Sequence, residues 1–71
     1  MEANARIIKN IKALIDEKGM KQKAVARLCG FNQQQFSNLL NGRMEIKAEY
    51  IPAIAMALNV TPNDIFIGKQ A

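Results

Sequence analysis

The sequence of 71 residues lacks the side chains on which most catalytic and metal sites are built. It contains no histidine, a single cysteine, Cys29, and a single serine, Ser37. One cysteine without histidine cannot form a disulfide framework, a zinc-ligand set or a cysteine–histidine dyad, and Ser37 has no histidine base to activate it. We therefore expect a protein that is not an enzyme and that holds no metal ion or cofactor.

The sequence also lacks a long hydrophobic run and a signal peptide. The apolar segment 7–15 is interrupted by Lys9, Asn10 and Lys12, and the longest uncharged stretches contain Asn, Pro or Gly. These stretches are too short and too polar to span a bilayer, which needs about 20 apolar residues. A chain of this size buries only about 60% of its unfolded surface, enough for one small core. We expect one soluble, cytoplasmic domain over residues 1–71, with no membrane contact and no evident small-molecule ligand.

Positive charge is concentrated in the middle of the chain. The whole net charge of +4 falls in residues 19–47, where five cations stand against one carboxylate, Glu45. A local excess of positive charge is typical of a protein with a polyanionic partner. The same charges are also compatible with a simple role in solubility. The five cations are Lys21, Lys23, Arg27, Arg43 and Lys47.

Apolar spacing and capping residues predict helices in the first half of the chain. Apolar residues between Ile7 and Ile15 recur at i, i+4 spacing, with Asn4 as the N-cap and Gly19 as the end of the helix. A second helix starts at Lys21 or Gln22 and ends before Gly30. Its apolar set is Val25, Ala26, Leu28 and Cys29.

Three more helices are predicted by similar signals. Asn32 is the N-cap of a third helix over residues 33–41. A fourth starts near Ala48 or Glu49, which places Pro52 in its first turn, where proline is tolerated. Segment 61–64, Thr-Pro-Asn-Asp, has the capping pattern of a fifth. No window shows the alternation of a β-strand, so the expected fold class is all-α, a compact five-helix bundle.

Residues 22–42 have the pattern of a helix-turn-helix. Ala26 must be small because the following helix crosses close to it, and Gly30 supplies the backbone freedom that the turn requires. Five side chains are expected to pack the two helices on each other and on the rest of the bundle. They are Val25, Cys29, Phe31, Phe36 and Leu39.

The third predicted helix has an outer face of amides without charge. At about 100° per residue, Phe36, Leu39 and Leu40 share one face and the opposite face centres on Gln34. Six of the ten residues 32–41 are Asn or Gln. Amide side chains pair bidentately with adenine in the major groove, at about 1–3 kcal/mol of discrimination per pair. The alternative is that these amides form only a solvated helix face.

With these residues, the sequence resembles the phage repressor and Cro-like (XRE-type) helix-turn-helix DNA-binding family from about Ala5 to Gly68. The resemblance implies a lambda-repressor-like fold whose second and third helices form the helix-turn-helix, with the third in the major groove. It also implies that Gln22 contacts a phosphate and braces a reading side chain. The resemblance rests on Gly19-x-x-Gln22, Val25-Ala26 followed by Gly30, Asn41-Gly42-Arg43 and the segment from Ile51 to Asp64.

One departure from the family pattern concerns the core. Many members carry an Arg–Glu ion pair between the first and third helices, at the positions of Ile15 and Leu40 here. Replacing both members of a buried pair with apolar residues is often neutral or stabilising, whereas replacing one is costly. We therefore expect Ile15 and Leu40 to be in contact.

The candidate site residues fall into two groups. For Asn41, Gly42 and Arg43, which end the third helix, phosphate contact follows from the resemblance and is compatible with an ordinary C-cap role. The residues expected to read bases are Gln33, Gln34, Gln35, Ser37 and Asn38. Those expected to contact phosphates are Gln22, Lys23, Asn32, Asn41, Gly42, Arg43 and Lys47.

The remaining chemically notable residues are expected to be structural. Cys29 is expected to be a small buried hydrophobe and not a redox sensor. Met20, Met44 and Met56 are expected in the core or as loop filler, and Tyr50 and Phe66 in the core.

Together these features predict a sequence-specific regulator of transcription that binds double-stranded DNA, in the form of a repressor. A homodimer on a palindromic operator is expected, with half-site centres about 10 bp apart or a multiple of that. Ile67 is a candidate for the dimer surface if Ile65 and Phe66 fill the core. Two alternatives stay open: a protein-interaction module such as an antitoxin or accessory factor, with DNA binding secondary, and a purely structural helical domain.

Overall fold

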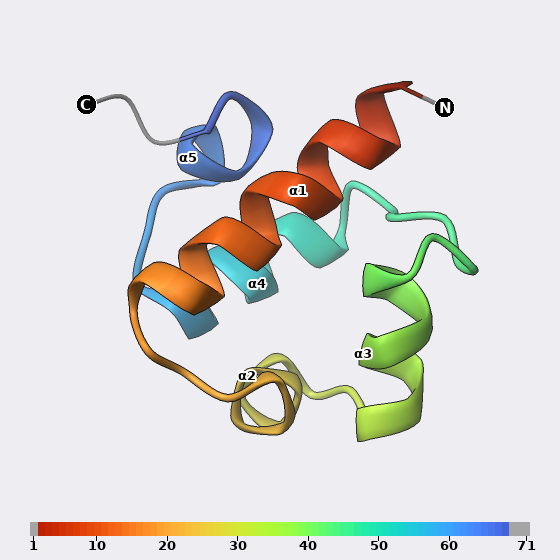
Figure 1. Cartoon of the computed structure of the whole chain (residues 1–71), viewed down its shortest axis with the longest axis vertical. Coiled ribbons are helices and arrows are strands. Elements are labelled where there is room, and N and C mark those ends of the chain that lie inside the picture. Colours follow the sequence, from red (N-terminus) through yellow and green to blue (C-terminus); the bar gives the residue numbers. More distant parts are fainter. Residues whose placement is uncertain (1, 69–71) are drawn as a thin grey trace.

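The computed structural model describes residues 2–68, with side chains from Asn4 onward, and over this range the chain folds into five helices without a strand (Figure 1). The predicted all-α five-helix bundle is confirmed. No helix in this range is long and apolar enough to cross a membrane. The helices are α1 (Glu2–Glu17), α2 (Gln22–Cys29), α3 (Gln33–Leu40), α4 (Tyr50–Leu58) and α5 (Pro62–Phe66).

All five helices contribute to one hydrophobic core. In Figure 1, α1 crosses in front of α4, while α2 and α3 lie along the lower and right-hand sides. α1 packs against α3 and α5, α4 packs against α2 and α5, and α2 packs against α3. No polar side chain of the described residues is buried. The core residues are Ile11, Leu14, Ile15, Val25, Ala26, Phe36, Leu39, Leu40, Ile51, Ile54, Ala55, Leu58 and Ile65.

The turn between α2 and α3 is closed by two backbone hydrogen bonds. The N–H of Gly30 donates to the carbonyl of Arg27 at 3.1 Å, and the N–H of Phe31 donates to that of Ala26 at 2.9 Å. This Schellman pattern needs a residue in the left-handed region, and Gly30 has φ +85°. α4 ends in the same way with Asn59, at φ +57°, in place of glycine. The turn therefore follows from local backbone geometry.

Aromatic side chains tie this turn to the rest of the bundle. The ring of Phe31 stacks on that of Phe36 in α3, with centroids 6.1 Å apart, and meets the ring of Tyr50 in α4 edge-on at 5.1 Å. Such aromatic pairs stabilise a fold by about 0.5–1.5 kcal/mol beyond their burial. Phe31 thereby fixes the start of α3 against α4.

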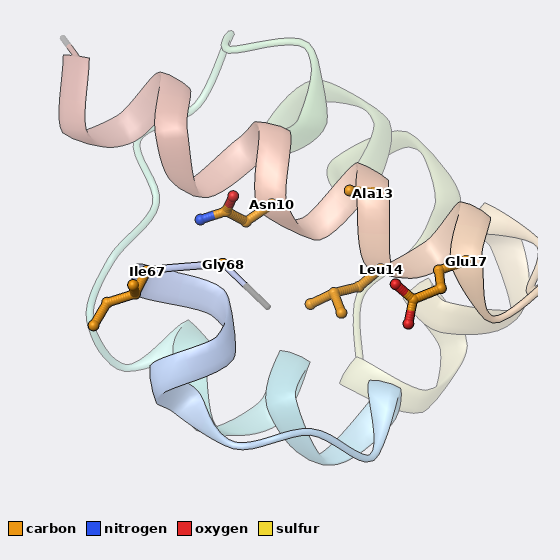
Figure 2. A pocket seen from close by; sticks show the side chains of 6 residues that line it. All are labelled: Asn10, Ala13, Leu14, Glu17, Ile67 and Gly68. Carbon is orange, nitrogen blue, oxygen red and sulfur yellow. The ribbon is translucent and has the colours of Figure 1, made fainter. Parts of the chain in front are cut away.

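α5 is held to α1 by a side-chain amide. The Nδ2 of Asn10 donates to the carbonyl oxygen of Ile65 at 2.8 Å, so an α1 residue satisfies one of the free carbonyls at the end of α5. Figure 2 shows Asn10 pointing toward this end of α5 beside a hollow of about 290 Å³, with Ile67 pointing away from it. The start of α5 is a capping box between Thr61 and Asp64, as the sequence predicts.

The structure corrects three details of the predicted helices. α1 begins at Glu2, so Asn4 is inside the helix and not its N-cap. Its Oδ1 instead accepts a hydrogen bond from the N–H of Ile46 at 3.2 Å. α3 ends at Leu40, with Asn41 as its C-cap and not its last residue. α4 begins at Tyr50, after a tight turn at residues 47–49.

Several apolar residues are more exposed to solvent than the sequence predicts. Leu28, which belongs to the apolar set of α2, is 62% exposed, and Met56, expected in the core or as loop filler, is 83% exposed. Phe66, predicted in the core, is 45% exposed and Ile67 is 54% exposed, so of these two residues and Ile65 only Ile65 fills the core. Met20, Met44, Tyr50, Cys29 and Phe31 do pack against the core as partly buried residues. Ile15 and Leu40 are both buried in it, and their direct contact stays a prediction.

The left-handed conformation of Gly30 predicts how substitutions at this position change the stability of the fold. A Cβ at this position would meet no atom within 4 Å, so the cost of Gly30→Ala comes from φ +85° alone. We expect it to lower the free energy of unfolding by about 1–2 kcal/mol, measured by urea denaturation followed by circular dichroism. Gly30→Asn is the matched control and should lose less, because Asn59 adopts the same conformation. A Gly30→Ala variant as stable as the wild type would contradict this.

Candidate nucleic-acid interface

α3 has a buried inner face and an outer face of polar side chains. Phe36, Leu39 and Leu40 are in the core, whereas Gln33, Gln34 and Gln35 are exposed and Ser37 and Asn38 are half-buried. The structure therefore brings all five residues predicted to read bases onto one helix, outside the core. None of them is charged, so this surface has hydrogen-bonding capacity without an electrostatic preference of its own.

The first turn of α3 is closed by a capping box. The Oδ1 of Asn32 accepts from the N–H of Gln35 at 2.7 Å, and the Oε1 of Gln35 accepts from the N–H of Asn32 at 3.1 Å. Two backbone N–H groups that would otherwise lack a partner are satisfied in this way. Gln35 is thus bent back toward the helix start, at the margin of the outer face, and its oxygen already has a partner.

Two further side-chain hydrogen bonds run along the outer face. The Nε2 of Gln34 donates to the Oδ1 of Asn38 at 3.1 Å, and the Nδ2 of Asn41 donates to the Oγ of Ser37 at 3.3 Å. Both pairs are four residues apart, the spacing at which side chains on a helix are neighbours. Gln33 has no such partner among the described residues. The outer face is therefore partly ordered by its own hydrogen bonds.

The C-terminal end of α3 uses its backbone N–H groups internally. Those of Asn41, Gly42 and Arg43 donate to the carbonyls of Ser37, Leu39 and Asn38 at 3.0, 3.3 and 2.9 Å. Gly42, at φ +76°, completes this Schellman motif. Any contact that this end makes with a phosphate therefore has to come from the side chains of Asn41 and Arg43, while Gly42 keeps the backbone free of a Cβ.

Cations flank α3 on both sides. Lys21, Lys23 and Arg27 lie at the start and along the exposed side of α2, and Arg43 and Lys47 lie in the loop after α3. None of the five is paired with a carboxylate within residues 2–68. Gln22, predicted to contact a phosphate, is the first residue of α2 and is also exposed.

A hollow of about 330 Å³ lies where α2 meets the start of α3. Its lining includes Lys23, Asn32 and Gln33, all predicted site residues, together with Arg27 and Phe31. Arg27 was not among the predicted phosphate contacts, although its place one helical turn after Lys23 is a signal that the sequence contains. A second hollow, of about 360 Å³, adjoins Gly42 and Arg43 at the other end of α3.

Cys29 lies outside this interface, and its thiol is expected to have low reactivity. Its Sγ is 3.9 Å from the carbonyl oxygen of Ala53 in α4, and burial raises the pKa of the thiol to about 11. The neutral thiol therefore dominates at physiological pH, which agrees with its predicted structural role. No group of three or more Cys, Asp or Glu side chains within residues 2–68 is placed to hold a metal ion.

These features define the class of protein. Two short helices joined at a glycine turn, with the second presenting a polar outer face, form a helix-turn-helix unit of the DNA-binding type. The sequence model of the Cro/C1-type HTH DNA-binding domain matches residues 10–70. The chain therefore belongs to the family of Cro/C1-type HTH DNA-binding domains, in agreement with the resemblance seen in its sequence. No match is found among curated proteins.

Two solved structures have a similar fold. The clp gene regulator ClgR from C. glutamicum is 20% identical, with a TM-score of 0.86 over 93% of this chain and 86% of that chain. The hypothetical transcription factor NHTF from Neisseria is 26% identical, with a TM-score of 0.84 over 92% of this chain and 75% of that chain. Both alignments extend over nearly all of the present chain, so the likeness concerns the whole bundle and not only α2 and α3.

The raised pKa of Cys29 predicts low thiol reactivity. At pH 8 we expect the folded protein to react with a thiol reagent such as DTNB about a hundredfold more slowly than the protein unfolded in guanidinium, because thiolate is the reacting form. The folded pKa lies above the ordinary value of 9.0, so the thiol ionises first in the unfolded protein. Ionisation therefore lowers the free energy of unfolding as the pH rises from about 9 to about 11, and this loss persists at higher pH. Equal rates at pH 8 for the folded and unfolded protein would contradict this assignment.

Proposed function

We propose that the protein is a sequence-specific regulator of transcription that inserts α3 into the major groove of double-stranded DNA. The observation that carries the proposal is the uncharged amide face of α3 between two groups of unpaired cations. An α-helix fits the major groove, where base edges present distinct patterns of donors and acceptors. Cations on both sides of the helix suit the two phosphate backbones that border the groove.

The outer face of α3 supplies the base contacts. Gln33 and Gln34 are exposed in the first turn and are suited to bidentate pairing with adenine, and Asn38 follows one turn later. Ser37 accepts a hydrogen bond from Asn41, so its own hydroxyl hydrogen is free to donate. Gln35 keeps its Nε2 for a base at the margin, because its Oε1 belongs to the capping box.

Phosphate contacts supply affinity without sequence information. On one side of α3 they involve Gln22, Lys23 and Asn32, to which the hollow beside α2 adds Arg27. On the other side they involve the side chains of Asn41, Arg43 and Lys47. Gly42 contributes only through its missing Cβ, which lets a phosphate approach these side chains closely.

The operator is proposed to be palindromic and bound by a homodimer. One α3 reads one half-site, and two copies related by a twofold axis read half-sites with centres about 10 bp apart or a multiple of that. One domain over residues 1–71 is sufficient to bind each half-site of the operator. The names of the two structural relatives, a gene regulator and a hypothetical transcription factor, support a role in transcription. We propose repression, by exclusion of other proteins from the site.

In vitro selection from random duplexes tests this function directly. We expect an enriched sequence with twofold symmetry and A·T pairs in each half-site, because amides favour adenine. If α3 did not enter the major groove, the selection should enrich no sequence. Equal binding of all duplexes, or an A·T-poor consensus, would contradict amide readout and would favour a protein-interaction module.

The flanking cations predict a distinct salt dependence. The logarithm of affinity should fall steeply with the logarithm of salt concentration, and Arg43→Ala should flatten this slope by about one unit on every duplex. Arg27→Ala should do the same if the hollow beside α2 meets a phosphate. Fluorescence anisotropy at several salt concentrations measures both effects.

Lys12→Ala is the matched control for these variants. Lys12 is an exposed cation of α1, outside the 19–47 segment, so its removal should leave the slope unchanged. If Arg43→Ala and Lys12→Ala had the same slope as the wild type, the cations beside α3 would not be phosphate contacts.

A further inference from the structure

The hydrogen bond between Gln34 and Asn38 joins two residues that are both proposed to read bases. The Nε2 of Gln34 is the donor and the Oδ1 of Asn38 the acceptor, at 3.1 Å. Exposed pairs of this type stabilise a helix by only about 0.2–0.5 kcal/mol. Their effect on stability is therefore small, and their larger effect is on the orientation of the two planar amides.

The bond divides donors and acceptors unequally between the two side chains. An amide NH₂ has two hydrogens, so Gln34 retains one N–H and its Oε1, the pair that adenine N7 and N6 require. In Asn38, the oxygen is turned toward Gln34, and because the amide is planar, the Nδ2 points the other way. Asn38 thus presents hydrogen-bond donors to a base.

The two residues reach different base pairs. Four residues of helix rise about 6 Å, whereas successive base pairs are about 3.4 Å apart. A base read by Asn38 is therefore one or two steps from the base read by Gln34. A donor at that point favours guanine, with N7 and O6, or thymine, with O4.

We propose that Gln34 and Asn38 read DNA as one hydrogen-bonded unit, in which Gln34 pairs with adenine and Asn38 donates to guanine or thymine on a nearby base pair. This inference rests on the proposed function. The preference of Asn38 for an acceptor edge is set by Gln34, so specificity at the two base pairs is coupled. Gln33 has no side-chain partner within residues 2–68 and reads its base independently.

A double-mutant cycle tests the coupling. Affinity for the selected duplex is measured for Gln34→Ala, Asn38→Ala and the double variant, and for the matched set in which Gln33→Ala replaces Gln34→Ala. The Gln33 and Asn38 losses should multiply to within about twofold. The loss of affinity in the Gln34 and Asn38 double variant should be smaller, by about threefold or more, than the product of the losses in the two single variants. All three side chains lie outside the core and alanine favours helix, so the variants keep the fold.

The outcomes separate the two proposals. If the wild-type protein showed no preference among duplexes, the proposed function itself would be contradicted. A wild-type protein with a preference, but with losses that multiply equally in both sets, would overturn the coupled unit and leave the function intact.

Gln34→Glu supplies a second, independent test. A carboxylate cannot donate, so Asn38 would have to reverse its amide and donate to Glu, which leaves its oxygen facing the DNA. Preference should then change at both base pairs: from adenine toward cytosine at the first, and from guanine or thymine toward the donor edges of adenine or cytosine at the second. Relative affinities for duplexes with single base-pair changes measure this. A change confined to the first base pair would overturn the proposal.

Discussion

The burial of one face of α3 is the constraint on which the interface depends. A helix of eight residues is too short to be stable alone, so the core that it joins determines both its existence and its rotation. Burying Phe36, Leu39 and Leu40 contributes about 1.5–3 kcal/mol for each side chain. The amide bonds on the outer face contribute about 0.2–0.5 kcal/mol each. The core therefore decides which residues of α3 face outward, and the amide bonds only adjust how those residues are presented.

This division also explains how charge is distributed around the site. An Arg or Lys on the outer face of α3 would bind phosphates of any sequence and would compete with base contacts. In this chain the cations beside α3 lie on α2, just before it and in the loop after α3, while α3 itself is neutral. In the proposed function, non-specific affinity and base discrimination thus come from different elements, which can vary independently as long as the core holds α3 in place.

Much of this arrangement could be predicted from the sequence because its determinants are local. Asn32 and Thr61 begin helices and Gly30 ends one through hydrogen bonds within four or five residues. The errors have non-local causes. Asn4 has the residue type of an N-cap, but the helix extends beyond it and its oxygen bonds Ile46, which is 42 positions away.

Exposed apolar residues were the second kind of error. Spacing shows that Leu28 and Met56 share helices with core residues, but not that no neighbouring element covers them. In a small bundle many apolar side chains remain at the surface, because there is too little interior to receive them. The side-chain bond between Gln34 and Asn38 was equally beyond prediction, since i, i+4 spacing permits it but side-chain rotamers decide it.

The two ends of α3 connect the proposed reading residues to the proposed phosphate contacts through short hydrogen bonds. The N–H of Arg43 donates to the carbonyl of Asn38 at 2.9 Å, so a residue proposed to read a base also holds the backbone of a proposed phosphate contact. At the other end, Asn32 caps α3 and lines the hollow that contains Lys23 and Arg27. Because these links are short and local, the helix itself fixes the distance between the backbones of the proposed phosphate contacts and those of the proposed reading residues. The register of α3 along the groove would therefore be set before any base is contacted, and the long cationic side chains need only complete it.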